Sequence, residues 1–195
     1  MAVSSTMLAL GTPAPDFTLP DVVSGAVVSR DDYAGTKALL VMFLCNHCPY
    51  VKHVRSGLAE LGRDYVDADL AIVAISANDV DQYPDDSPEA MAKEAGDIGY
   101  TFPYLFDESQ QVAAAYTAMC TPDFFLFGPD RTLVYRGRFD ETRPNMPGAV
   151  TGSDLRSAID AVLDDHPVSE QQYPSMGCSI KWKPGNVPAY FDAAS

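Results

Sequence analysis

The chain has 195 residues, of which 47% are hydrophobic and 21% charged, a composition typical of one globular domain with a sizeable core. Its formal net charge is -14, and its acidic residues are spread along the sequence, which predicts a solvated acidic surface. This charge, and the lack of a basic stripe with interleaved aromatic residues, argue against nucleic-acid binding.

The first residues lack both the basic start and the long apolar core of a signal peptide, and no apolar run reaches membrane-spanning length. The sequence therefore predicts a cytoplasmic protein without membrane contact. Thiols are kept reduced in the cytoplasm, so the four cysteines favour catalysis or metal binding over a structural disulfide framework.

The first half of the chain alternates between extended and helical patterns. A Pro-rich opening segment at residues 12–20 is extended, and a short hairpin is expected around residues 25–28. The unbroken apolar run at residues 39–44 predicts a buried strand, and helical apolar spacing follows it at residues 49–61. A second apolar run at residues 70–76 predicts a strand that is covered on both faces.

The second half completes the pattern of an α/β protein. Ser87, followed by Pro, predicts the start of another helix. The later elements are a helix, an antiparallel hairpin and a last helix, at residues 110–116, 124–127 with 132–137, and 153–164. This order implies a central mixed β-sheet flanked by helices on both faces. We expect one domain over residues 1–166, with the Pro- and Gly-rich residues 167–195 packed on it as an irregular C-terminal tail.

Two cysteines three residues apart, Cys45 and Cys48, lie where the first buried strand ends and a helix begins. The free N–H groups and the dipole of a first helical turn stabilise a thiolate, the reactive form of cysteine. We expect a dithiol–disulfide couple in which Cys45, nearer to the helix start and to solvent, attacks and Cys48 resolves the mixed disulfide. His47, between them, is a candidate substrate-binding residue or a surface residue without a partner.

A zinc site is the alternative use of these cysteines. A structural zinc site usually needs two paired-ligand motifs, and this chain has one. Cys120, Cys178, His47 and His53 are the other possible ligands, and none has ligand spacing to a neighbour. We therefore expect neither a metal nor an organic cofactor, because the thiols themselves hold the electrons.

A Thr-Pro pair, Thr121 and Pro122, stands just before the strand expected at residues 124–127. Together with the apolar strand and the cysteines that open a helix, it resembles the thioredoxin superfamily and predicts a thioredoxin-like fold. The resemblance implies that Pro122 is cis and packs against the disulfide. It also implies that the backbone of Thr121 docks an extended substrate.

Other segments narrow the resemblance. Residues 11–19 are similar to the opening of the alkyl hydroperoxide reductase/thiol-specific antioxidant (redoxin) branch of that superfamily. Residues 43–51, 120–125 and 177–186 together resemble a peroxiredoxin-like group that carries a thioredoxin-type Cys-x-x-Cys. The matching segments run through most of the chain.

The chain departs from two features of these relatives. Peroxiredoxins place a Pro seven residues, and a Thr or Ser three residues, before the peroxidatic cysteine; here Ala38 and Met42 occupy those positions. Thioredoxin has a buried acid six residues before its first cysteine, where this chain has Leu39. The first departure removes a hydroxyl that would hold a peroxide, and the second removes a proton acceptor.

The resemblance implies a thiol–disulfide oxidoreductase with an antioxidant role, acting on protein disulfides or small thiols through Cys45 and Cys48. Thioredoxin or a similar thiol system would reduce it again. Two alternatives stay open: a peroxiredoxin-like thiol peroxidase with Cys45 as the peroxidatic residue, and a non-catalytic interaction module.

Two further cysteines, Cys120 and Cys178, are candidate auxiliary redox residues, as a second pair or as a relay to the first. The alternative interpretation makes Cys120 a small buried residue and Cys178 a bystander. The sequence specifies neither the oligomeric state nor the direction of electron flow.

Overall fold

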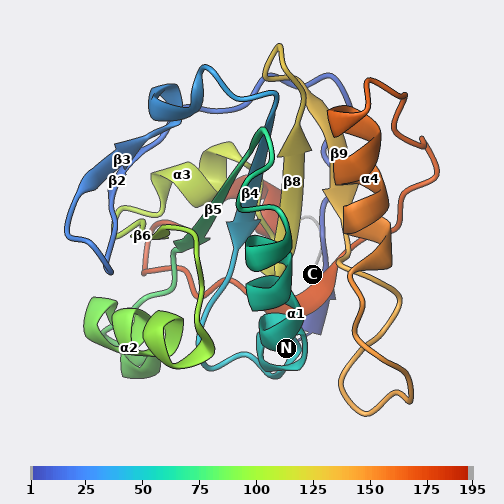
Figure 1. Cartoon of the computed structure of the whole chain (residues 1–195). Coiled ribbons are helices and arrows are strands. Elements are labelled where there is room, and N and C mark those ends of the chain that lie inside the picture. The colour runs from blue at the N-terminus through green and yellow to red at the C-terminus, as the bar shows by residue number, and fades with distance from the viewer. Residues whose placement is uncertain (1, 193–195) are drawn as a thin grey trace.

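The computed structural model describes residues 2–192. Five strands form its central sheet: β4 (Ala38–Phe43), β5 (Leu70–Ser76), β6 (Tyr104–Phe106), β8 (Asp123–Phe127) and β9 (Leu133–Gly137). Their order in space is β6-β5-β4-β8-β9, with β4, β5 and β6 parallel and with β8 antiparallel to both of its neighbours (Figure 1). The antiparallel pair β8–β9 is the hairpin that the sequence predicts.

Helices cover both faces of this sheet. One face carries α1 (Pro49–Asp64), α2 (Pro88–Ile98) and α4 (Ser153–Leu163), as Figure 1 shows. The other face carries α3 (Gln111–Ala115), the N-terminal segment and the chain around α5 (Ala189–Asp192). Two single turns of 3-10 helix, η1 (Arg30–Tyr33) and η2 (Pro84–Asp86), lie in loops. The mixed sheet between two helical layers confirms the α/β architecture expected from the sequence.

The central strand β4 shows why this arrangement forms. Its six residues are completely buried, and they alternate between the two cores because successive side chains in a strand point to opposite faces. Leu40 and Met42 face α1 and α4, whereas Leu39 and Val41 face the layer that contains α3. A strand that is apolar on both sides is stable only when both faces are covered.

Five short strands lie outside the central sheet. β2 (Thr18–Pro20) and β3 (Val27–Ser29) pair as the N-terminal hairpin. β1 (Ala2–Ser4), β7 (Cys120–Thr121) and β10 (Met176–Ser179) form an antiparallel sheet in the order β1-β10-β7. The expectation of an irregular C-terminal tail is wrong for these residues, because β10 pairs with a strand on each side and α5 follows it.

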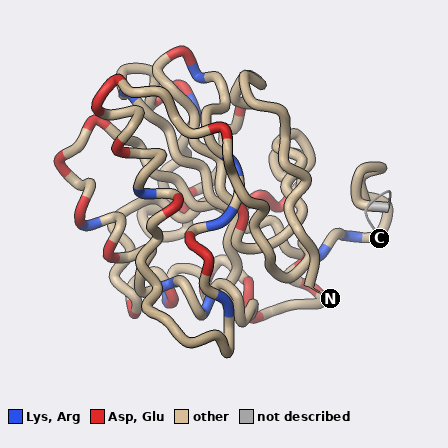
Figure 2. Tube along the Cα trace, turned by 90° about the vertical axis from the view of Figure 1, so that its right-hand side faces the viewer, with Lys and Arg blue, Asp and Glu red and all other residues tan. Residues whose placement is uncertain are grey.

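The acidic residues of the described part of the chain are not gathered in a single patch. Figure 2 shows acidic residues along many separate segments of the chain, with fewer basic residues between them. Within residues 2–192, no helix combines the length and the apolar composition needed to cross a membrane.

β8 begins with a buried carboxyl group, that of Asp123. One of its oxygens accepts a hydrogen bond from the Met119 backbone N–H at 3.3 Å, and the other has no partner among the described residues. Burial without an opposite charge disfavours the ionised form, so the pKa of Asp123 is raised to about 8. The side chain is on the face of the sheet opposite to Cys48, since Phe125 and Phe127 of the same strand pack in the α3 layer.

We predict that Asp123→Asn flattens the pH dependence of stability. Between about pH 4 and pH 8, Asp123 is protonated in the folded protein and ionised in the unfolded chain, so unfolding releases a proton. As the pH rises through this range, the free energy of unfolding of the wild type should therefore fall by up to about 1.4 kcal/mol per pH unit, compared with that of the variant. Urea unfolding of both proteins from pH 5 to pH 9 measures this difference. A difference that stays constant over that range would contradict the buried, protonated state of Asp123.

Candidate active site

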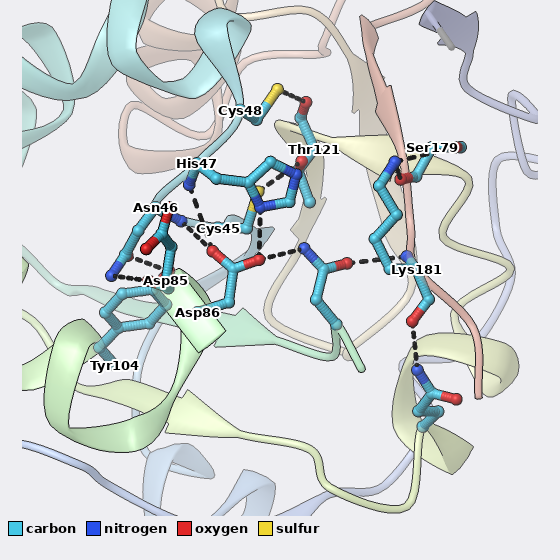
Figure 3. Close-up of polar contacts among 12 residues, drawn as sticks. Cys45, Asn46, His47, Cys48, Asp85, Asp86, Tyr104, Thr121, Ser179 and Lys181 are labelled. Carbon is cyan, nitrogen blue, oxygen red and sulfur yellow. Dashed lines mark hydrogen bonds and ion pairs between the residues drawn. The ribbon is translucent and has the colours of Figure 1, made fainter. Parts of the chain in front are cut away.

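Cys45 and Cys48 flank the turn between β4 and α1, and both contact Thr121. The sulfur of Cys45 lies 3.1 Å from the Thr121 hydroxyl oxygen, and the sulfur of Cys48, when protonated, donates to the Thr121 carbonyl oxygen, also at 3.1 Å (Figure 3). The peptide bond between Thr121 and Pro122 is cis, as the resemblance implies. The structure thus brings together the two cysteines and the Thr-Pro pair, all of which the sequence predicts to be site residues.

The start of α1 differs from the expected one. α1 begins at Pro49 with Cys48 as its N-cap, so Cys45 stands three residues before the cap. Both residues are buried, Cys45 at 1% and Cys48 at 0% exposed. The expectation that Cys45 is nearer to the helix start is therefore wrong, and neither cysteine is exposed to solvent. Proline is well suited to the first helical position because it lacks the N–H that would have no partner there.

The groups around the reduced pair favour a negative charge on Cys48 over one on Cys45. Hydrogen bonds, chiefly from the Cys45 thiol and also from the Cys178 thiol and the Val51 backbone N–H, together lower the pKa of Cys48 to about 4 despite burial. The hydrogen bond from the Cys45 thiol, with burial and the charge of Asp86, raises the pKa of Cys45 well above its usual value. These effects favour the proton on Cys45 and the charge on Cys48, and the attacking role that the sequence assigns to Cys45 stays a prediction.

Asp86 fixes the turn that carries the two cysteines. It is completely buried in η2, and one oxygen accepts hydrogen bonds from the backbone N–H groups of Asn46 at 2.8 Å and His47 at 3.2 Å. The other oxygen accepts from His47 Nδ1 at 2.6 Å and from Asn78 Nδ2 at 2.8 Å. Burial alone would raise the pKa of Asp86, but these hydrogen bonds, chiefly the one from His47, lower it instead.

His47 is therefore not a surface residue without a partner. Besides its bond to Asp86, its ring stacks on Tyr83 with centroids 5.1 Å apart and an interplanar angle of 17°. Asp86 is a site residue that sequence reasoning missed, because it is 39 positions from His47 and no local pattern connects the two. The only sequence feature that could have pointed to Asp86 is the turn-rich loop in which it lies.

The same groups raise the question of a metal site. Cys45, His47 and Asp86 each place a potential ligand atom within 4.8 Å of the others, a set that transition metals accept. Both oxygens of Asp86 already accept hydrogen bonds, and Nδ1 of His47 is committed to Asp86. His53 lies apart and contacts Thr142 Oγ1 at 2.9 Å. The contacts describe a hydrogen-bond network, and a protein without metal remains our prediction.

The structure separates the two auxiliary cysteines. In the β7–β10 ladder, Cys178 is opposite Thr121 and Ser179 is opposite Cys120. Because neighbouring residues point to opposite faces, Cys178 shares the face of Thr121 while Cys120 points away. Cys120 is buried, and its thiol donates to the Pro122 carbonyl oxygen at 3.6 Å. Cys178 therefore packs against the apolar cluster that contains Cys48, on the face away from Cys120.

The segment after β10 is tied to the same network. The Lys181 backbone N–H donates to Asn78 Oδ1 at 2.8 Å, and the Lys181 carbonyl accepts from Gln110 Nε2 at 2.8 Å (Figure 3). Asn78 also donates to Asp86, so a continuous chain of hydrogen bonds connects the cysteine turn to the C-terminal segment.

We predict that the first thiol to ionise in the reduced protein is Cys48. The thiolate absorbance near 240 nm should rise with a midpoint at about pH 4, because the surrounding donors stabilise that anion. Cys48→Ser should abolish this transition, and the control variant Cys120→Ala should keep it. A midpoint near that of free cysteine, or a transition lost in Cys45→Ser and kept in Cys48→Ser, would contradict the assignment.

Asp86→Ala should lower the free energy of unfolding by about 1–3 kcal/mol at pH 7, because it leaves buried donors without an acceptor. The neighbouring Asp85→Ala removes an exposed carboxylate and should change stability by less than about 0.5 kcal/mol. The pKa of Asp86 is lowered by folding, so its contribution is present above about pH 4 and is lost as the pH falls further. Urea unfolding at pH 7 and at pH 3 measures both effects; equal losses in the two variants would refute the role of Asp86.

The AhpC/TSA family matches residues 10–136. A Mycobacterium tuberculosis protein that is provisionally named a peroxiredoxin is 32% identical over 114 residues, which cover 58% of this chain and 67% of that protein. The thiol-disulfide oxidoreductase ResA of Geobacillus kaustophilus is 26% identical over 157 residues, 80% of each chain.

Solved structures show the same fold. An uncharacterized conserved protein from Geobacillus kaustophilus is 52% identical and aligns with a TM-score of 0.93 over 95% of this chain and 98% of its own. A secreted Mycobacterium tuberculosis disulfide oxidoreductase, 20% identical, aligns with a TM-score of 0.56 over 74% of this chain and 95% of its own, which shows a shared thioredoxin-like fold. The chain thus belongs to the AhpC/TSA (redoxin) family of the thioredoxin superfamily.

Proposed function

We propose that this protein is a thiol–disulfide oxidoreductase that acts on protein or small-molecule disulfides through the Cys45–Cys48 couple. The observation that carries the proposal is the geometry of the pair: Cys48 caps α1 three residues after Cys45, and the two sulfurs each lie 3.1 Å from an oxygen of Thr121, beside its cis bond to Pro122. Such a pair stores two electrons as a dithiol and releases them as a disulfide. Its family includes relatives named for disulfide exchange and for peroxide reduction.

The reduced protein reacts in two steps. When β10 opens to admit a substrate disulfide, the Cys48 thiolate attacks one of its sulfurs, forms a mixed disulfide and releases the other substrate sulfur as a thiolate. Cys45 then loses its proton and attacks the Cys48 sulfur, which closes the Cys45–Cys48 disulfide and releases the second substrate thiol. His47, held by Asp86 close to Cys45, is placed to accept that proton.

A second candidate function is a thiol peroxidase with Cys45 as the peroxidatic residue. The Thr121 hydroxyl lies 3.1 Å from the Cys45 sulfur, so it supplies from another strand the hydroxyl that Met42 lacks. However, the reaction with peroxide requires a thiolate, and Cys45 is the protonated member of the pair. Disulfide exchange is therefore the better supported of the two.

The cellular setting is part of the proposal. A cytoplasmic location, an antioxidant role and re-reduction by thioredoxin or a similar thiol system agree with a couple whose thiols must be kept reduced between turnovers. A non-catalytic interaction module is the remaining alternative, and it requires that partner binding survive the loss of Cys45.

Disulfide reduction tests the proposal. We expect the full chain to reduce a fluorescently labelled disulfide peptide, with dithiothreitol as the electron source. Cys45→Ser and Cys48→Ser should each lower turnover to the uncatalysed rate, because each removes one of the two sulfurs that close the cycle. Cys120→Ala, the matched control, should stay active. Wild-type turnover at the uncatalysed rate would refute the proposal.

Stopped-flow oxidation by hydrogen peroxide separates the two enzymatic candidates. Because Cys45 is protonated and buried, we expect it to be oxidised no faster than a free cysteine thiolate. The loss of the Cys45 thiol, followed by alkylation and mass spectrometry, measures the rate. Oxidation orders of magnitude faster than that of the free thiolate would favour the peroxidase.

A further inference from the structure

The C-terminal strand β10 lies directly on the peptide unit that joins Thr121 to Pro122. A Cβ atom added to Gly177 would lie 2.0 Å from the Thr121 carbonyl oxygen and 2.6 Å from its carbonyl carbon, so only glycine permits this approach. Cys178, the next residue, is opposite Thr121 in the ladder. The Thr121 carbonyl oxygen is also the acceptor for the Cys48 thiol at 3.1 Å.

These contacts bring a third sulfur to the pair. The Cys178 side chain packs against the apolar cluster that contains Cys45 and Cys48, and its thiol lies close enough to Cys48 to lower the pKa of that residue, so Cys48 is the middle member of a row of three sulfurs. The members differ in access to solvent: Cys45 and Cys48 are buried, whereas Cys178 is partly exposed. While β10 stays in place, Cys178 is therefore the member of the three that an external thiol can reach from solvent.

We propose that Cys178 is a third redox-active cysteine, through which the buried Cys45–Cys48 disulfide exchanges with external small thiols. The proposal rests on the proposed function and names the residue where its electrons enter. It differs from a Cys120–Cys178 pair, because the strand register directs Cys120 to the other face.

The first step is an exchange without net oxidation. The Cys178 thiolate attacks the Cys48 sulfur of the Cys45–Cys48 disulfide; the Cys48–Cys178 bond forms, and Cys45 leaves as a thiolate that takes up a proton. Burial and the charge on Cys48 raise the pKa of Cys178 to about 12 in the reduced protein. Once Cys48 is in a disulfide, that charge is absent and Cys178 ionises more readily.

The next steps bring in electrons. An external thiolate attacks the Cys178 sulfur, forms a mixed disulfide with it and releases Cys48 as a thiolate. A second external thiolate attacks the external sulfur of this mixed disulfide, which releases an external disulfide and the Cys178 thiolate. Two external thiols are oxidised, and the protein gains two electrons and returns to three free thiols.

Contacts on both sides hold β10 during these exchanges. β1 pairs along its other edge, with Ala2 opposite Cys178. The Ser175 hydroxyl donates to the Pro122 carbonyl oxygen at 2.6 Å, and the Ser175 backbone N–H donates to Ser5 Oγ at 2.9 Å. The Lys181 backbone is bound by Asn78 on the far side. The sulfur of Cys178 is thus positioned by the fold.

Trapping in the full chain tests the contact. Cys45→Ser removes the usual partner of Cys48, so one equivalent of diamide should produce a Cys48–Cys178 disulfide, identified by mass spectrometry of peptides prepared without reduction. In the double variant with Gly177→Ala, the added methyl group displaces β10, and the yield of this disulfide should fall. Gly35→Ala, at an exposed glycine with free space around it, is the matched control and should not change the yield.

A main disulfide between Cys48 and Cys120, or an intermolecular disulfide of Cys48, would overturn the proposal. A yield that is unchanged by Gly177→Ala would overturn the role given to β10. These results do not depend on enzymatic activity, because they report where the sulfurs meet.

Reduction kinetics test the function of Cys178. Glutathione should reduce the oxidised Cys178→Ser variant at least about tenfold more slowly than the wild type, since its buried disulfide is then reached only when β10 opens. Cys120→Ala should match the wild type. An equal or faster rate in Cys178→Ser would overturn this inference and leave the proposed function standing, whereas a wild type that forms no Cys45–Cys48 disulfide would remove both.

Discussion

The position of Thr121 beside the first turn of α1 is the contact on which the rest of the site depends. Its hydroxyl meets the Cys45 sulfur, its carbonyl meets the Cys48 thiol, and its backbone pairs with Cys178. Three cysteines from distant parts of the chain therefore converge on one residue. The central sheet fixes this position, because β8 follows Thr121 after one residue and pairs along β4, the strand that leads to Cys45.

Electrostatics then decide which sulfur carries the charge. The N-terminus of α1 and the thiol donors surround Cys48, while the buried carboxylate of Asp86 stands on the side of Cys45. A negative charge is favoured at the first position and disfavoured at the second. Asp86 also holds His47 and the turn by hydrogen bonds. One buried carboxylate thus both fixes the loop and helps to raise the pKa of Cys45.

The parts of this site that were predictable are those with local patterns. The apolar run of β4, the spacing of Cys45 and Cys48, and the Thr-Pro pair are each contained within a few residues. Pro49 carried a further local signal, since proline is common at the first helical position and so marks Cys48 as the cap. The site features that sequence reasoning missed depend on long-range contacts. Asp86 is 39 positions from His47 in the sequence and contacts the turn only in the folded protein. The residues of β10 have weak strand propensity, and they form a strand because they pair with a neighbouring strand on each side.

Redox equilibration of the full chain in glutathione buffers, read by alkylation of Cys45 and Cys48 and mass spectrometry, is the most direct test that these residues act as a couple. We predict one two-electron transition at a potential above about -270 mV, the value of thioredoxin, because the anion stabilised on Cys48 favours the reduced form. Thiols that stay reduced throughout the series, or a potential below about -270 mV, would contradict it.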